Sequence, residues 1–268
     1  MNKYAVFVMG PAGTGKTTFC KTMLEKFVLS KKNVGFVNLD PAAVQTRKSL
    51  KTTFDIRDKW SLESVMRDKM LGPNGGLIKC LELMIDERTW LEDNLCGYGE
   101  EFMFVDCPGQ IEVYLHSNAM QDIINVFKEN NYNVCVAFLL DSQFLLDKSK
   151  YLAGILNTLS AMLQLELPHV NIVTKMDLFP NYENEDEETK YESIQNLLYP
   201  DMDLFAQEGG ELEKAFVELV DTYNLVNYLP LDITDEKSIS LVINYLNNVL
   251  QNDDIDLNMT DYEFNKDI

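Results

Sequence analysis

The sequence predicts an α/β fold with a mainly parallel central sheet flanked by helices. Five short runs of apolar and β-branched residues alternate with longer helical patterns along the chain. Each run is hydrophobic almost throughout, as expected for strands buried on both faces. Alternation of strand and helix patterns is typical of parallel sheets with helices on both sides. With 268 residues, 46% of them hydrophobic, the chain can form one substantial core.

The individual elements follow from these patterns. Strands are expected at residues 4–9, 34–39, 102–105, 134–140 and 170–173. The helical patterns between them cover residues 16–29, 62–70, 77–95, 111–129 and 144–165. A further helix, a last strand and a closing helix are expected at 211–223, 228–231 and 238–250. We expect one domain at 1–250 with an insertion at about 60–96, an acidic loop at 181–190 and an acidic flexible tail at 251–268.

The charge and the cysteine content of the chain argue against several classes of function. The chain has 43 acidic and 23 basic residues, and the net charge of −20 disfavours direct nucleic-acid or membrane binding. No apolar run approaches the roughly 20 residues that span a bilayer, and no signal segment is evident, so we expect a cytoplasmic protein with protein partners. Five cysteines are scattered without a close pair, which favours reduced core residues over a zinc site.

The strongest chemical signal lies between the first expected strand and the first expected helix. This segment fits the pattern G-x-x-x-x-G-K-[ST] of phosphate-binding loops. Its glycines let backbone N–H groups point at phosphate oxygens, its lysine neutralises the β- and γ-phosphates, and its threonine hydroxyl can hold Mg²⁺. We therefore predict a P-loop fold with a nucleotide site made by Gly10, Pro11, Ala12, Gly13, Thr14, Gly15, Lys16, Thr17 and Thr18.

A second group of candidates follows the strand expected at 102–105. Asp106 ends this apolar run, and Gly109 can offer its N–H to a γ-phosphate. In P-loop proteins such an aspartate holds Mg²⁺, and a residue just beyond the glycine orients the attacking water. Thr17 and Asp106 are therefore the predicted Mg²⁺ ligands, and Gln110 and Glu112 are candidates for positioning water.

A third motif indicates the base. Thr174-Lys175-Met176-Asp177 resembles the [NT]-K-x-D motif of GTPases. The Asp177 carboxylate can accept hydrogen bonds from N1–H and the amino group of guanine, whereas adenine lacks matching donors, and the Lys175 stem can cover the base. Thr174 stands where asparagine is commoner, so a nucleotide choice broader than GTP stays open.

Two further segments are ambiguous by themselves. Asp40 ends the strand at 34–39 and competes with Gln110 and Glu112 for the role of positioning water, although Asp-Pro is also an ordinary strand terminator. The pentapeptide Gly72-Pro73-Asn74-Gly75-Gly76 predicts a turn, because proline fixes φ and the other residues tolerate left-handed backbone.

Together these motifs resemble the GPN-loop GTPases in order and spacing, over about the first 235 residues. The resemblance implies a GTPase activated by dimerisation, with GTP or GDP and Mg²⁺ as ligands. It also implies that Gly72, Pro73 and Asn74 reach toward the partner's phosphates, while Asp40, Asp106 and Gln110 act in their own protomer. Residues 138–144 and Thr174 are most similar to one eukaryotic paralogue of the family.

The same resemblance implies a wider role. It points to assembly and nuclear import of RNA polymerase II, with polymerase subunits as clients and nuclear shuttling from the cytoplasm. The dimer partner is either a GPN-loop paralogue or a second copy of the chain. Two alternatives stay open from the residues alone: a nucleotide-stabilised scaffold with negligible hydrolysis, and an ATP-dependent kinase, which Asp177 argues against.

Overall fold

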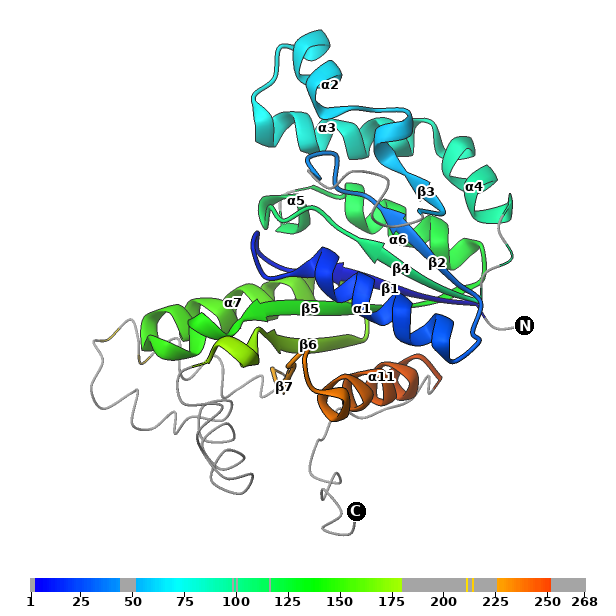
Figure 1. The fold of residues 1–268 in the computed structure, drawn as a ribbon. Helices are drawn as coiled ribbons and strands as arrows, with labels where there is room; N and C mark the ends of the chain where they lie inside the picture. The colour runs from blue at the N-terminus through cyan, green and yellow to red at the C-terminus, as the bar shows by residue number, and fades with distance from the viewer. Residues whose placement is uncertain are drawn as a thin grey trace, which may run out of the picture.

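A computed structural model of the chain describes residues 3–43, 52–97, 99, 101–115, 117–179, 211, 214 and 226–251. Its centre is a seven-stranded sheet with the strand order β3-β2-β4-β1-β5-β6-β7 (Figure 1). All neighbouring strands are parallel, which confirms the predicted fold class. The strands are β1 (Lys3–Met9), β2 (Val34–Asn38), β3 (Phe54–Asp55), β4 (Phe102–Asp106), β5 (Tyr132–Asp141), β6 (His169–Thr174) and β7 (Tyr228–Pro230).

The strand order places the carboxyl end of β1 at the middle of the sheet. The chain leaves β1 toward β2 and β3 on one side, returns to β4 beside β1, and then continues through β5, β6 and β7 on the other side. In open α/β sheets, ligands bind at the carboxyl ends of the strands where the direction of winding changes. The loops after β1, β2 and β4 are therefore the expected place of a site.

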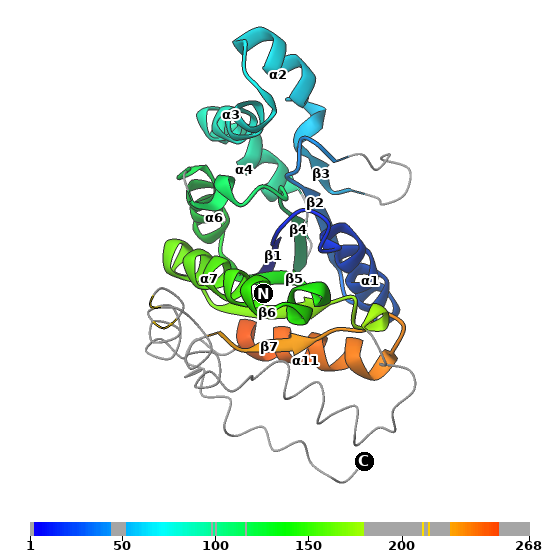
Figure 2. The ribbon, with the colours of Figure 1, turned by 90° about the vertical axis from the view of Figure 1, so that its left-hand side faces the viewer.

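Helices cover both faces of this sheet. Along β1, Val6 and Val8 belong to a core with α1 (Lys16–Leu29) and α11 (Glu236–Gln251), while Phe7 and Met9 belong to a core on the opposite face. That second core includes side chains of α6 (Ala119–Glu129) and α7 (Lys148–Leu165). Figure 2 shows α6 and α7 on the side of the sheet opposite α1. Burial of both faces explains why the strand sequences are continuously apolar.

The expected insertion lies at the β3 end of the sheet, where buried residues of its helices join the same core as α6 (Figure 2). After the 3₁₀ turn η1 (Ile56–Asp58) it contains α2 (Leu62–Lys69), α3 (Pro73–Asp86) and α4 (Arg88–Gly97). Trp60 and Trp90 contact edge to face within it, with ring centroids 5.1 Å apart. Gly76 permits close packing of α2 and α3, because a Cβ there would lie 2.6 Å from a side-chain carbon of Met66.

Several expected boundaries were wrong, each for a local reason. The single helix expected at 77–95 is two helices, because α3 ends at Glu87, whose backbone leaves the helical region. The helix expected at 111–129 is also split, into α5 (Glu112–Leu115) and α6, where the Ser117 hydroxyl accepts a hydrogen bond from the Ala119 N–H. Residues 144–146 lie in the 3₁₀ turn η2 (Ser142–Leu146), and α7 begins only after Asp147 caps it through the Lys150 N–H.

Other expectations have different outcomes. The acidic loop, the tail after Gln251 and nearly all of the helix expected at 211–223 lie outside the described residues. Cys20, Cys80, Cys107 and Cys135 are buried, as predicted, but Cys96 is exposed. Within the described part of the chain, no helix has the length and apolarity that crossing a membrane requires.

Candidate functional site

The loops that follow β1, β2 and β4 line an open cavity of about 420 Å³ at the carboxyl edge of the sheet. Most of the residues predicted to bind phosphate or to act on it line this cavity. Its described lining consists of Ala12, Gly13, Gly15, Lys16, Thr17, Thr18, Asp40, Ala42, Ala43, Leu77, Asp106, Gly109 and Gln110. The fold thus brings together segments that lie far apart in the sequence.

The phosphate loop depends on glycines at defined positions. Gly10 has φ 132° and lies so close to β5 that a Cβ would be 2.2 Å from the Leu139 carbonyl oxygen. Gly13 and Gly15 have φ of 85° and 86°, in the left-handed region that other residues adopt at a cost. Gly15 caps α1, so the free N–H groups and the positive end of the helix dipole face the cavity.

Lys16 is buried at the base of this loop. Its Nζ donates hydrogen bonds to the carbonyl oxygens of Gly10 and Pro11, both at 3.0 Å. Burial lowers the pKa of Lys16, while the neighbouring carboxyl groups of Asp106 and Asp40 raise it. At Gly109 a Cβ would lie 3.1 Å from the Lys16 Nζ, so the loop after β4 closely approaches the lysine. The ammonium group is therefore held where it can meet phosphate oxygens of a nucleotide.

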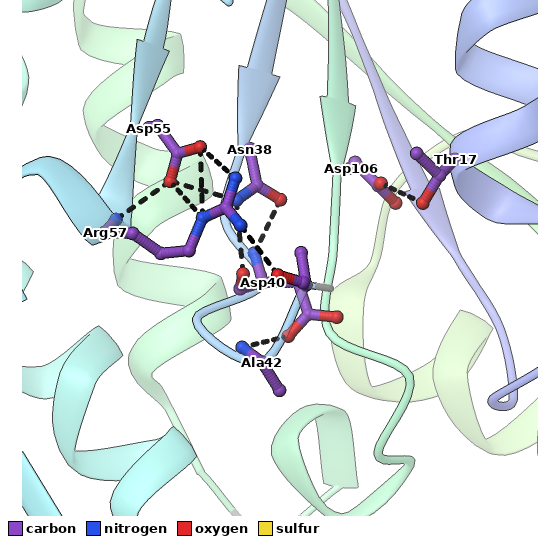
Figure 3. A network of polar contacts seen from close by, with 8 residues as sticks. Thr17, Asn38, Asp40, Ala42, Asp55, Arg57 and Asp106 are labelled. Carbon is purple, nitrogen blue, oxygen red and sulfur yellow. Dashed lines mark hydrogen bonds and ion pairs between the residues drawn. The ribbon is translucent and has the colours of Figure 1, made fainter. Parts of the chain in front are cut away.

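Thr17 and Asp106 meet directly beside Lys16. The Thr17 Oγ1 donates a hydrogen bond to Oδ2 of Asp106 at 2.6 Å, and Asp106 is only 2% exposed (Figure 3). Burial raises the pKa of Asp106 to about 6, although the Thr17 hydrogen bond and the Lys16 charge oppose this shift. Hydroxyl and carboxylate oxygens are hard donors of the kind that Mg²⁺ prefers, so the pair fits the predicted metal ligands.

Asp40 also lines the cavity, in the turn of residues 40–43. Its Oδ1 accepts a hydrogen bond from the Ala42 N–H at 2.8 Å (Figure 3). The turn is closed by a second hydrogen bond, from the Ala43 N–H to the Asp40 carbonyl at 3.2 Å. Burial raises the pKa of Asp40, whereas the Ala42 hydrogen bond and the Lys16 charge lower it. The side chain faces the same cavity as Lys16 and Asp106.

The other two candidates for positioning water differ in location. Gln110 lines the cavity directly after Gly109. Glu112 is exposed in the first turn of α5 and is not among the described residues that line the cavity. The loop that leads to Gln110 is held by a buried side chain, because the Tyr114 hydroxyl donates a hydrogen bond to the Pro108 carbonyl.

The base motif lies at the carboxyl end of β6 and is tied to the phosphate loop. Thr174 Oγ1 contacts two carbonyl oxygens, at 2.8 Å on Thr14 and at 3.1 Å on Leu140. Lys175 adopts left-handed backbone, with φ 61°, and its Nζ contacts Oδ2 of Asp141 at 2.5 Å. Asp177 follows, half-buried, in the 3₁₀ turn η3 (Met176–Leu178). Thr174 thus links the two motifs through its hydroxyl, despite its replacement of the commoner asparagine.

The pentapeptide of residues 72–76 does not form the expected turn, because Pro73 to Gly76 are helical. Gly72 caps α3, Pro73 occupies its first turn, and the following glycines already belong to the helix. The left-handed residue lies earlier, at Met70 with φ 54°. Asn74 is exposed, and it is absent from the described lining of the cavity, although Leu77 of the same helix is present.

Sequence patterns assigned no role to three polar residues around the turn of residues 40–43. Asn38, Asp55 and Arg57 form a hydrogen-bonded network behind Asp40 (Figure 3). Asp141 was also missed as the partner of Lys175, although it ends an apolar strand just as Asp106 does. Among the described residues, no group of three or more histidine, cysteine, aspartate or glutamate side chains could hold a metal ion.

Known proteins that are similar to this chain are described as nucleotide-binding proteins or GTPases. A family described as "conserved hypothetical ATP binding protein" matches residues 8–252. The GPN-loop GTPase 3 of Danio rerio is 40% identical over 263 residues, covering 94% of this chain and 89% of the relative. For the protein of the same name from Mycosarcoma maydis the identity is 39% over 262 residues, covering 94% and 92%.

A solved structure supports the fold. The apo form of a GTPase from Pyrococcus abyssi superposes with a TM-score of 0.72 at 19% identity, covering 92% of this chain and 97% of that one. The family description names ATP, whereas these relatives are named GTPases. The more specific names agree with the aspartate of the base motif, which matches guanine rather than adenine.

Proposed function

This chain belongs to the GPN-loop GTPase family and hydrolyses GTP, and we propose that it does so as a magnesium-dependent switch whose active site is completed in a dimer. The observation that carries the proposal is the meeting of Lys16, Thr17 and Asp106 in one cavity with Asp40 and Gln110 on its walls. A phosphate cradle, a hard-oxygen metal pair and water-positioning groups are the parts that phosphoryl transfer requires.

The proposed reaction is in-line attack of water on the γ-phosphorus of GTP. The bond between the γ-phosphorus and the β–γ bridging oxygen breaks, giving GDP and phosphate. Lys16 and the N–H groups at the start of α1 bind the phosphate oxygens and stabilise the charge that develops on them. When bound, Mg²⁺ neutralises negative charge on the β- and γ-phosphates, and Thr17 and Asp106 would hold it.

In this proposal either Asp40 or Gln110 positions the attacking water. Both residues line the cavity, whereas the exposed Glu112 is not among the described residues that line it. The raised pKa of Asp40 reflects burial, which places its carboxyl group in surroundings where hydrogen bonds to a water molecule are strong. Phosphoryl transfer depends more on orientation of the nucleophile than on its deprotonation.

Dimerisation supplies the remaining group. Asn74 is exposed at the start of α3, away from the described lining of its own cavity, which suits a side chain that serves the partner's site. We propose that Gly72, Pro73 and Asn74 approach the phosphates of a second copy or of a paralogue. An uncharged amide there can donate to a phosphate oxygen or hold a water molecule.

The wider role is proposed on family membership. In this view the chain assists assembly and nuclear import of RNA polymerase II from the cytoplasm, with polymerase subunits as clients. Its net charge of −20 favours protein partners over direct contact with nucleic acid or membrane.

Turnover measured against protein concentration tests the dimer. The rate of phosphate release per protomer should rise with concentration, for the chain alone or mixed with a paralogue. Asn74→Ala should lower this rate roughly tenfold or more while leaving GTP affinity nearly unchanged. Lys69→Ala, an exposed change in the same insertion, is the matched control and should behave as wild type. A constant rate per protomer, or wild-type turnover by Asn74→Ala, would exclude a site completed in trans.

A further inference from the structure

Asp55 and Arg57 form an ion pair at the edge strand β3, outside the cavity itself. The Arg57 Nε donates to both carboxylate oxygens of Asp55, at 2.9 and 3.1 Å, and Nη2 donates to Oδ2 at 2.5 Å. The Asp55 side chain is fully buried, and that of Arg57 is 19% exposed. Neither residue is among the described residues that line the phosphate cavity.

The pair reaches Asp40 through Asn38. Asn38 and Asp55 are register partners on β2 and β3, and the Asn38 Nδ2 donates to Oδ1 of Asp55 at 3.0 Å. The Asn38 amide also forms two hydrogen bonds with the backbone of Asp40. Its Nδ2 donates to the Asp40 carbonyl at 3.1 Å, and its Oδ1 accepts from the Asp40 N–H at 3.2 Å. Asp55 therefore fixes which way the amide points.

A second connection runs to the other end of the turn. The Arg57 Nη1 donates to the Ala43 carbonyl at 2.6 Å. Residues 40–43 are thus held at the start through Asn38 and at the end by the guanidinium group. Asp40, Ala42 and Ala43 all line the cavity, so the network lies directly behind one of its walls.

The charges of the network remain in place at neutral pH. Burial raises the pKa of Asp55, but hydrogen bonds from Arg57 and Asn38 outweigh burial and leave that pKa below its usual value. A planar guanidinium group can contact a carboxylate with two N–H groups and still donate elsewhere, which a lysine cannot do with the same geometry.

We infer that Asp55 and Arg57 are a positioning pair for GTP hydrolysis, which holds the turn of residues 40–43 so that Asp40 presents its carboxyl group to the attacking water. This inference rests on the proposed role of Asp40. The hydrogen bonds of the pair described above reach Asn38 and the turn of residues 40–43, and we therefore expect an effect on kcat and not on nucleotide binding. Misplacement of a reacting group by about 1 Å can lower a rate roughly a hundredfold.

The experiment measures kcat and KM for GTP and the Kd for GDP, at protein concentrations where turnover per protomer is maximal. Arg57→Met should lower kcat by roughly tenfold to a hundredfold and change the GDP Kd less than twofold. Arg57→Lys keeps the positive charge, and its kcat should lie between that of Arg57→Met and that of wild type. Lys59→Met, which removes the nearby ion pair with Glu87 but touches no part of the turn, is the matched control and should keep the wild-type kcat.

A double-variant comparison separates positioning from general damage. If Arg57 acts through Asp40, Arg57→Met should have little further effect on kcat in an Asp40→Asn background. A full additional loss in that background, a wild-type kcat for Arg57→Met, or a GDP Kd that changes as much as kcat would overturn the inference. If Asp40→Asn itself keeps wild-type turnover, the proposed role of Asp40 fails first. Should Arg57→Met not fold, Arg57→Lys is read by the same criteria.

Discussion

The Thr17 Oγ1 lies 2.6 Å from Oδ2 of Asp106, which joins the first turn of α1 to the carboxyl end of β4 beneath the phosphate cavity. Asp106→Asn keeps an oxygen that can accept this hydrogen bond but removes the negative charge. We therefore expect the variant to fold, and to need roughly tenfold or more Mg²⁺ for half-maximal GTP turnover. The measurement is a Mg²⁺ titration of turnover, with GDP binding in a metal chelator as control. An unchanged Mg²⁺ requirement would exclude Asp106 as a ligand.

Thr174 provides a matched pair of buried hydroxyl deletions. Thr174→Val removes the hydroxyl that contacts the Thr14 and Leu140 carbonyls, whereas Thr158→Val removes one that contacts Gly154 and Tyr228. Each change should lower the free energy of unfolding by about 1–3 kcal/mol, because buried polar groups lose their partners. Only Thr174→Val should also weaken GTP binding, since only it touches the phosphate loop. If calorimetry gave the same GTP affinity for Thr174→Val and Thr158→Val, the hydrogen bond between Thr174 and Thr14 would not support the nucleotide site.

Asp177 should decide the choice of base. Asp177→Asn replaces an acceptor of two guanine hydrogen bonds by an amide, and hydrogen bonds to charged groups contribute about 1.5–3 kcal/mol each. GTP affinity should therefore fall roughly a hundredfold or more, while xanthosine triphosphate, which carries an oxygen in place of the guanine amino group, should gain affinity. Competition binding with both nucleotides checks this exchange, and undiminished GTP binding would place the base elsewhere.

His169 should make the fold sensitive to acid. Burial lowers its pKa to about 4, and its buried Nε2 has no hydrogen-bond partner among the described residues. Because this pKa lies below the unfolded value of 6.5, the unfolded state binds the proton first as pH falls. The stability that neutral His169 contributes is present above pH 6.5 and is lost toward pH 4.

The loss between pH 7 and pH 5 should amount to roughly 2 kcal/mol of unfolding free energy. Chemical denaturation of wild type and His169→Gln at both pH values measures it, because the variant lacks the titrating group. The difference in stability between the two proteins should shift in favour of the variant at pH 5. If wild type and His169→Gln lost the same unfolding free energy between pH 7 and pH 5, groups other than His169 would cause the acid sensitivity.

Local motifs made much of the site predictable. The phosphate loop, Asp106 and the base motif are contiguous sequence patterns at strand ends, and parallel strands bring their carboxyl ends to one edge. Glu112 lies in the short helix α5 and is exposed, which makes it a weaker candidate than Gln110. The sequence around these two residues contains no pattern that distinguishes the exposed side chain from the one at the cavity.

The network behind Asp40 could not be predicted in the same way. It depends on the pairing of Asn38 with Asp55 across β2 and β3, and β3 has only two residues, too few for an alternation pattern. The breaks in the helices expected at 77–95 and 111–129 were missed for a related reason. One break comes at Glu87, whose backbone is not helical, and the other beside a local hydrogen bond from the Ala119 N–H to the Ser117 hydroxyl, both within otherwise continuous helical patterns.

The most direct test of the account is phosphate release from GTP by wild type and Lys16→Ala, measured side by side with ATP as the competing substrate. Lys16 donates to the Gly10 and Pro11 carbonyls at the base of the cavity, where its charge meets the phosphates. Wild type should hydrolyse GTP in preference to ATP, and Lys16→Ala should be slower by roughly a hundredfold or more. Normal GTP hydrolysis by Lys16→Ala would contradict the assignment of the site.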